Sequence, residues 1–488
     1  MLNVAAIFAT PAMVSVLAGA FGMSSVLPPV STSDALAQQP IVSVATVANT
    51  AVGTVANTVV TTVASAVPSQ VGAVPVAGIP NGVPQPFIGP DPVGGGASLD
   101  TIAKLDGVAL LDQMVRLTPS ELDTFVSAHP DVLSELVAQP PAALEVAQWW
   151  SRASQAARGT LSADLPGVVG NLDGVPYAAR DVANRAFLVT TVDGIRAQLS
   201  AGVGRAMEDE LDARLHMLGE VSTALQRGPS GAKRSLVMLD VSGDGRAVVA
   251  IGDLATADYV SILVPGMYFG VDAQLVDWSA TADAMLVEQQ KWITRLGLPG
   301  TAATVSWIGY HTPTVVSAPS MQLAYEGRDA LTLTLQGIDA TRVANVQALP
   351  FVSIMAHSYG STAAMLALQE NDVTVDALAV VGSPGSPANN VKDLKVTGGN
   401  VWVGAADWDP IPRTGVYGSQ PLDADFGAHQ FSVKGTTDSV TGETLLDTVS
   451  HNDYFAPGTT SQRNLALIAL NQSSLVTSLG GLAKSASR

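Results

Sequence analysis

The stretch that decides the fold runs from Val352 to Ala364 and reads Val-Ser-Ile-Met-Ala-His-Ser-Tyr-Gly-Ser-Thr-Ala-Ala. An apolar run typical of a strand leads into a polar turn, and small residues typical of a closely packed helix follow it. A serine on such a strand-to-helix turn is a nucleophile elbow, because the sharp turn exposes its hydroxyl group. The new helix also directs its first N–H groups toward a developing oxyanion. We therefore interpret Ser358 as a nucleophile.

The elbow lies in a region where short apolar runs alternate with helical patterns. From Ser235 onward, strands are expected over residues 236–241, 247–251, 259–264, 303–308, 351–355, 377–381, 401–405 and 430–433. Helices are expected over residues 273–296, 322–349 (broken near Gly337) and 362–369. This alternation predicts an α/β fold with a mostly parallel sheet and helices on both faces, preceded by a helical region.

Ser242-Gly243-Asp244-Gly245 predicts a hairpin turn between the first two strands. Together with Asp240 it resembles half of a calcium-binding loop. Ile251 occupies the twelfth position of that loop, where a bidentate carboxylate is required. A turn is therefore the better interpretation.

Composition divides the chain into four segments. Residues 1–37 are expected to be a signal peptide or anchor, and residues 38–96 a spacer rich in Val, Ala, Thr, Pro and Gly. Residues 97–230 are expected to be a helical N-terminal or cap region, in which Thr118-Pro119-Ser120-Glu121 is a strong helix start. Residues 231–488 are expected to form the α/β domain that contains Ser358.

The N-terminus predicts export. Asp34 is the only charged residue among the first 90, and an apolar run over residues 4–21 precedes Ala35-Leu36-Ala37. This pattern is typical of a secretory signal cleaved after Ala37. The usual Lys or Arg before the apolar run is missing, so Met1 need not be the natural start, and an uncleaved anchor is the alternative. The protein is expected to be secreted or associated with the cell envelope.

The composition excludes several classes of function. The 488 residues include 24 Lys and Arg against 42 Asp and Glu, which gives a net charge of −18 and argues against nucleic acid as a partner. The chain has no cysteine, so disulfides, thiolate metal sites and cysteine nucleophiles are excluded. No metal or other cofactor is expected, and the oligomeric state is left open.

A serine nucleophile needs a histidine base and an acid that orients it. In α/β folds with a nucleophile elbow, these residues follow the order serine, acid, histidine along the chain. This order leaves His429 and His451 as candidates for the base. We favour His451, which lies in a loop before the final helix. For the acid we favour Asp409, because Pro410 restricts its loop, with Asp407 as the alternative.

The oxyanion formed during acyl transfer needs two backbone N–H donors. One is expected from Tyr359, directly after the nucleophile. The other is expected from Met267, because Gly266 allows the loop after strand 259–264 to approach closely.

From about Leu165 to the end, the chain resembles an alpha/beta hydrolase family of high-GC Gram-positive bacteria, long listed as a domain of unknown function. Nine ordered pieces carry the resemblance: residues 171–176 with 179–185, 263–266, 307–310, 357–361, 381–385, 409–411, 426–428 and 451–455. The resemblance implies Ser358, Asp409 and His451 as the triad. This chain departs from the family at Ala356, where glycine is usual, and at Met267-Tyr268-Phe269, where residues are often smaller.

These features predict an exported serine hydrolase that cleaves a carboxylic ester, with a small-molecule or lipid ester as its substrate. A peptidase or an acyltransferase would use the same triad. The alternative from another class is a non-catalytic, envelope-associated binding or structural protein that retains the fold. In that case residues 38–230 would be the functional part.

Overall fold

The computed structural model describes residues 98–479. The predicted signal peptide or anchor and the whole of the predicted spacer lie outside these residues. Within the described range, no helix is both long enough and apolar enough to cross a bilayer.

The first part of the described chain is helical. Its helices are α4 (Leu99–Ile102), α5 (Gly107–Met114), α6 (Pro119–Ala128), α7 (Pro130–Ala138), α8 (Ala143–Arg152), α9 (Gln155–Asp164), α10 (Pro166–Val169), α11 (Tyr177–Ala201) and α12 (Arg205–Ala224). The predicted start of α6 is confirmed: the Thr118 side chain accepts from the N–H of Glu121, whose carboxylate accepts from the N–H of Thr118.

An eight-stranded sheet follows the helices. Its strands are β1 (Arg234–Asp240), β2 (Arg246–Ile251), β3 (Tyr259–Val264), β4 (Ala302–Ile308), β5 (Phe351–His357), β6 (Ala377–Val381), β7 (Val401–Gly404) and β8 (His429–Gln430). Their order is β1-β2-β4-β3-β5-β6-β7-β8. The β1–β2 and β2–β4 pairs are antiparallel, and all the others are parallel. Two short strands, β9 (Thr436–Thr437) and β10 (Thr444–Leu445), form a separate pair.

Helices cover both faces of the sheet, so the predicted α/β class is confirmed. One face packs against α14 (Gln322–Ala344) and α15 (Tyr359–Glu370), and the other against α13 (Val271–Leu296) and α16 (Thr460–Ala469). Neighbouring residues of one strand enter opposite cores: Ile354 of β5 faces the first core and Met355 the second. Burial on both faces explains why the strands read as continuous apolar runs.

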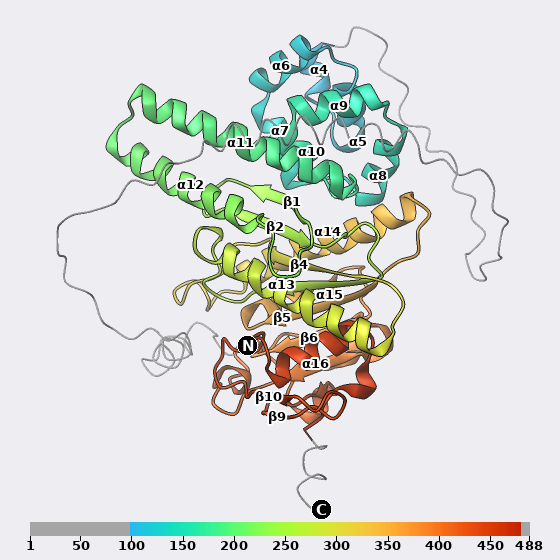
Figure 1. The fold of residues 1–488 in the computed structure, drawn as a ribbon. Helices are drawn as coiled ribbons and strands as arrows, with labels where there is room; N and C mark the ends of the chain where they lie inside the picture. Colours follow the sequence, from blue (N-terminus) through green and yellow to red (C-terminus); the bar gives the residue numbers. More distant parts are fainter. Residues whose placement is uncertain (1–97, 480–488) are drawn as a thin grey trace, which may run out of the picture.

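The helical region has a hydrophobic core of its own, in which Trp149 and Trp150 are buried. Figure 1 shows these helices gathered at the β1 end of the sheet. There α11 packs along β1, α8 packs against α14, and α12 packs against α13. The strand that leads to Ser358 lies in the middle of the sheet instead.

Two expectations about the elements are wrong. Helix α14 is continuous through Gly337, where a break was expected. A Cβ at this position would lie 2.4 Å from Oδ1 of Asp173, so the glycine allows a close contact with the helical region rather than ending the helix. The strand expected over residues 430–433 is shorter: β8 ends at Gln430, and Phe431 forms only an isolated bridge to Ser478.

Candidate active site

The turn between β5 and α15 holds Ser358 in an uncommon backbone conformation, with φ 53° and ψ −130°. A positive φ in a residue other than glycine costs on the order of 1–3 kcal/mol, and such strain is frequent at functional sites. The neighbouring turn is closely packed, because a Cβ on Gly360 would lie 2.2 Å from the carbonyl oxygen of Pro265. The strained turn predicted from the sequence is therefore present.

The structure brings Ser358, His451 and Asp409 together from three separate loops. The Nε2 atom of His451 lies 2.9 Å from Oγ of Ser358, and its Nδ1 atom lies 2.9 Å from Oδ2 of Asp409. All three residues are buried. They meet because β5 and β7 are parallel, so the loops after these strands lie at the same edge of the sheet.

The environment of Asp409 keeps it ionised. Burial alone would raise the pKa of its carboxyl group. Hydrogen bonds from His451, Tyr454 and the N–H of Ile411 outweigh burial and hold the pKa below its ordinary value. An ionised carboxylate only accepts hydrogen bonds, so Nδ1 of His451 carries the proton. Its Nε2 atom is then free of a proton and accepts the hydrogen bond from the Ser358 hydroxyl.

The alternative residues lie elsewhere. Asp407 is exposed and forms an ion pair with Lys434, at 2.8 Å between Oδ2 and Nζ. His429 is exposed, and its ring lies against Trp402 with a centroid distance of 4.8 Å. Among the described residues, neither of these side chains forms a hydrogen bond with Ser358, whose hydroxyl bonds to His451 instead.

The loop after β3 lies directly against the nucleophile. A Cβ on Gly266 would lie 2.6 Å from Cβ of Ser358, so only glycine fits there. The hydroxyl of Tyr310 donates to the carbonyl of Pro265 at 2.8 Å and holds the loop in place. Tyr359 is the first residue of α15, so its N–H has no partner within the helix. That this N–H and the N–H of Met267 form the oxyanion hole stays a prediction.

Two residues whose side chains support the site, Tyr454 and His357, were not predicted from the sequence. The hydroxyl of Tyr454 donates to Oδ2 of Asp409 at 2.7 Å and accepts from the N–H of Ala406 at 2.9 Å. The Nε2 atom of His357 lies 2.7 Å from the carbonyl oxygen of His451, so it donates to it. The sequence offered one sign of the role of Tyr454: it lies three residues after His451, within the 451–455 piece that carries the family resemblance.

His357 is held in its neutral form. Burial lowers its pKa to about 3, and the nearby His451 ring, at a centroid distance of 4.6 Å, adds to this effect. Since Nε2 carries the proton that it donates to His451, its Nδ1 atom is a hydrogen-bond acceptor. The ring of His357 therefore supports the backbone of His451.

Tyrosine hydroxyls fix the segment that follows β4 near the elbow. Tyr268, which has a φ of 63°, accepts from the N–H of Val315 at 3.0 Å. Tyr359 donates to the carbonyl of Ser320 at 2.8 Å. Tyr417 donates to the carbonyl of Ala318 at 2.5 Å. The walls around the elbow are thus held by specific hydrogen bonds rather than by apolar packing alone.

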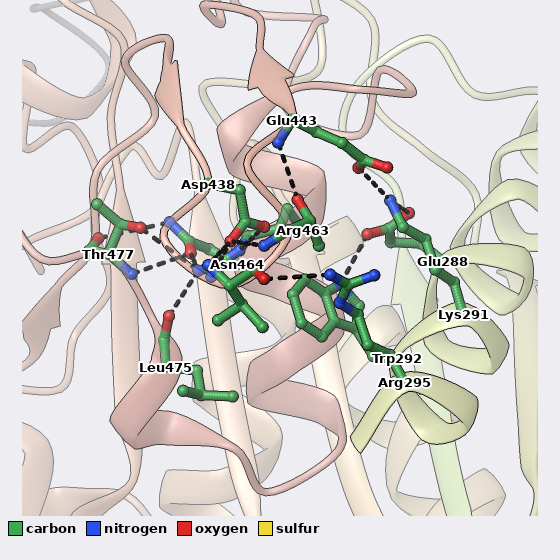
Figure 2. Close-up of polar contacts among 12 residues, drawn as sticks. Glu288, Lys291, Trp292, Arg295, Asp438, Glu443, Arg463, Asn464, Leu475 and Thr477 are labelled. Carbon is green, nitrogen blue, oxygen red and sulfur yellow. Dashed lines mark hydrogen bonds and ion pairs between the residues drawn. The ribbon is translucent and has the colours of Figure 1, made fainter. Parts of the chain in front are cut away.

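A second buried charged cluster anchors the chain on both sides of the His451 loop (Figure 2). The guanidinium group of Arg463, in α16, donates to both carboxylate oxygens of Asp438 at 3.0 and 3.2 Å. It also donates to Asn464 and to the carbonyl of Leu475, and it lies over the Trp292 ring at 5.2 Å. This cluster ties the β9–β10 segment and the C-terminal segment to α13 and α16.

Ion pairs on α13 extend this anchoring (Figure 2). Lys291 lies 2.8 Å from Glu443 and 3.7 Å from Glu288, and Arg295 donates to the carbonyl of Val440. The segment that precedes His451 is therefore held along the C-terminal half of α13.

Metal-binding residues do not gather anywhere in the described range. Residues 98–479 contain no group of three or more His, Asp or Glu side chains arranged to hold a metal ion. Asp240, the first residue of the loop that resembles a calcium site, pairs with Arg246 across the hairpin at 2.9 and 2.8 Å.

Comparisons with known proteins agree with the fold. Residues 240–418 match the model of a protein family described as alpha/beta hydrolase. This range includes Ser358 and Asp409, whereas His451 lies beyond it. Two proteins of Mycobacterium tuberculosis, named Uncharacterized protein MT2140 and Uncharacterized protein Rv2079, are each 25% identical to the chain over 387 residues. The alignment covers 70% of this chain but only 57% of each relative.

Solved structures with some likeness include a fungal esterase from Rhizomucor miehei, at 9% identity and a TM-score of 0.34, covering 58% of this chain and 96% of that one. Esterase LipW from Mycobacterium marinum is 12% identical, with a TM-score of 0.31, and the match covers 59% of this chain and 90% of that one. At these scores the likeness carries no information about substrates. The strand order, the covering helices and the family match together establish an alpha/beta hydrolase fold.

Proposed function

We propose that this protein is a serine hydrolase that cleaves carboxylic esters through an acyl-enzyme on Ser358. The observation that carries the proposal is the unbroken line of hydrogen bonds from Oγ of Ser358 through His451 to Asp409. A serine hydroxyl becomes a useful nucleophile when such a base takes its proton. The strained backbone of Ser358 supports the same role.

In the first half of the reaction, Oγ of Ser358 attacks the ester carbonyl carbon while its proton moves to Nε2 of His451. The N–H groups of Tyr359 and Met267 donate to the oxyanion, and Asp409 stabilises the imidazolium. His451 then gives the proton to the leaving alcohol oxygen as the carbon–oxygen bond breaks. In the second half, water attacks the acyl carbonyl, His451 takes its proton, and Ser358 regains a proton as the acid leaves.

An ester suits the site better than a peptide. The side chains of Met267, Phe269 and Trp278 are apolar or aromatic, so peptide N–H and C=O groups buried against them would lose hydrogen bonds to water. An apolar ester pays no such penalty. Export to the cell surface or beyond is part of the proposal and rests on the sequence of the first 37 residues alone.

The test is labelling of the full chain with a fluorophosphonate probe, which reacts with an activated serine. We expect labelling of the wild type and of two control variants, Ser134→Ala and His429→Ala, which change exposed residues. Ser358→Ala and His451→Ala are expected to abolish labelling. An unlabelled, folded wild type would favour the non-catalytic binding protein, and turnover of peptides but not esters would favour a peptidase.

A further inference from the structure

A cavity of about 680 Å³ lies beside the proposed triad. Its first wall is α13 and the loop before it, and its second wall is the loop that follows His451. The lining residues are Met267, Tyr268, Phe269, Gln274, Asp277, Trp278, Ala280, Thr281, Ala284, His357, Asn452, Phe455, Ala456 and Pro457. This volume lies within the range of cavities that bury a small organic ligand.

The lining of the cavity includes the direct chain neighbours of Ser358 and His451. His357, which lines it, directly precedes Ser358, and its ring packs on the ring of His451. Met267, which also lines it, follows Gly266, at which a Cβ would lie 2.6 Å from Cβ of Ser358. Asn452 is the residue after His451. A group attached to a carbonyl at Ser358 therefore has a direct route into the cavity.

The inner walls are aromatic. The rings of Phe269 and Trp278 meet edge to face at a centroid distance of 4.9 Å, and those of Trp278 and Phe455 at 5.4 Å. The indole N–H of Trp278 already donates to the carbonyl of Leu263 at 3.1 Å. Its ring therefore offers carbon surface to the cavity rather than a hydrogen-bond donor.

The charge of the lining restricts the ligand further. The residues that line the cavity, all within the described part of the chain, include no Lys or Arg. The one acid among them, Asp277, is exposed. A carboxylate or phosphate in the cavity would lose its hydration without gaining a cation.

We propose that this cavity binds an apolar chain of a neutral ester, supplied by either its acyl or its alcohol part. The inference rests on the proposed ester hydrolysis at Ser358. It narrows the substrates to neutral esters with an apolar chain long enough to reach past Trp278, and it excludes esters with an anionic group at the end of that chain.

The experiment measures kcat/KM of the full chain in two arms by titration of the released acid. One arm lengthens the acyl chain of p-nitrophenyl esters from acetate to octanoate, and the other lengthens the alcohol of alkyl acetates. In one of the two series, we expect kcat/KM to rise about fourfold for each added methylene until the cavity is filled. The arm that rises identifies the part of the ester that is bound.

The matched variants place a phenylalanine on α13. Ala284→Phe fills the cavity, and we expect it to reduce the rise to less than about twofold per methylene. Ala273→Phe makes the same change on an exposed position of the same helix outside the lining, and we expect it to keep the wild-type rise. A rise that persists in Ala284→Phe would overturn the proposal.

A measurement on the wild type covers the case in which Ala284→Phe does not fold. The mono-p-nitrophenyl ester of suberic acid has the length of the octanoate but ends in a carboxylate. We expect its kcat/KM to be at least about tenfold lower. Equal kcat/KM for the octanoate and the suberate monoester would overturn this inference. So would a kcat/KM that does not change with chain length in either series. Both results would leave the proposed hydrolase activity in place. A wild type that neither reacts with fluorophosphonate nor cleaves any ester would overturn the proposed function itself.

Discussion

Two of the buried charged clusters in residues 98–479, around Arg463 and around His451, differ in how their hydrogen bonds end. Around Arg463 the bonds close on themselves, because the guanidinium N–H groups meet Asp438, Asn464 and the carbonyl of Leu475. Around His451 the line of bonds runs outward, from Asp409 to the hydroxyl of Ser358 on a strained turn beside a cavity. The first arrangement suits holding the chain in place, and the second suits moving a proton.

The largest predicted effect on kcat/KM comes from replacing Asp409. Asp409→Asn is expected to lower kcat/KM by about 10⁴-fold, because the amide cannot hold the tautomer of His451 that accepts a proton from serine. Asp407→Asn, two residues earlier, is the matched control and is expected to change kcat/KM by less than about twofold. Ester hydrolysis by the purified variants measures both. Equal losses in the two variants would break the assignment of the acid.

The Arg463 cluster is predicted to matter for stability rather than for chemistry. Arg463→Leu leaves the Asp438 carboxylate buried without its partner, so we expect the free energy of unfolding to fall by about 3–5 kcal/mol. Replacing both residues by leucine is expected to recover part of that loss, since no unpaired charge remains. Urea unfolding measures the stability, and kcat/KM is measured on the folded fraction. A large loss of kcat/KM with unchanged stability would place Arg463 in the active site.

A smaller effect concerns pH and His357. Its folded pKa of about 3 lies below its ordinary value of about 6.5, so the unfolded chain binds a proton more readily than the folded one. The folded state therefore loses stability as pH falls from about 6.5 toward 3. Between pH 7 and pH 5, this group accounts for a loss of about 2 kcal/mol.

The variant His357→Gln tests whether His357 causes this loss of stability, because glutamine keeps an N–H donor for the carbonyl of His451 but does not titrate. Denaturant unfolding measures the free energy of unfolding at pH 7 and pH 5. Between these two pH values, we expect it to fall by about 2 kcal/mol less in the variant than in the wild type. The same drop in both proteins would mean that His357 is not held neutral. Asp409 does not contribute in this window, because its pKa is lowered and its stabilisation is lost only at more acidic pH.

Much of the fold could be predicted because the strands are buried on both faces. Runs such as Ile262–Val264 and Ala377–Val381 are continuously apolar, so they stand out without an alternating pattern. The turn at Ser358 could be found because close packing requires small residues around it. Gly337 misled the prediction, since the contact that requires it comes from Asp173, in the turn between α10 and α11, far away in the sequence. A local pattern carries no information about such a contact.

The residues of the candidate site could be predicted, but the hydrogen bonds that support them could not all be predicted. The order of serine, acid and histidine along the chain was enough to choose Asp409 and His451 over their alternatives, and the structure brings the chosen residues together. The hydrogen bonds from Tyr454 and His357 were not predicted, because their acceptor atoms belong to residues 45 and 94 positions away in the sequence. The Arg463–Asp438 pair was missed for the same reason.

The measurement that tests the central claim most directly is mass spectrometry of the enzyme stopped by acid during turnover of a p-nitrophenyl ester. We predict an acyl adduct on the peptide that contains Ser358, with its mass following the acyl chain supplied. The adduct should be absent in Ser358→Ala and should accumulate no faster than the burst of p-nitrophenol. An adduct on another residue, or hydrolysis that persists in Ser358→Ala, would contradict the account.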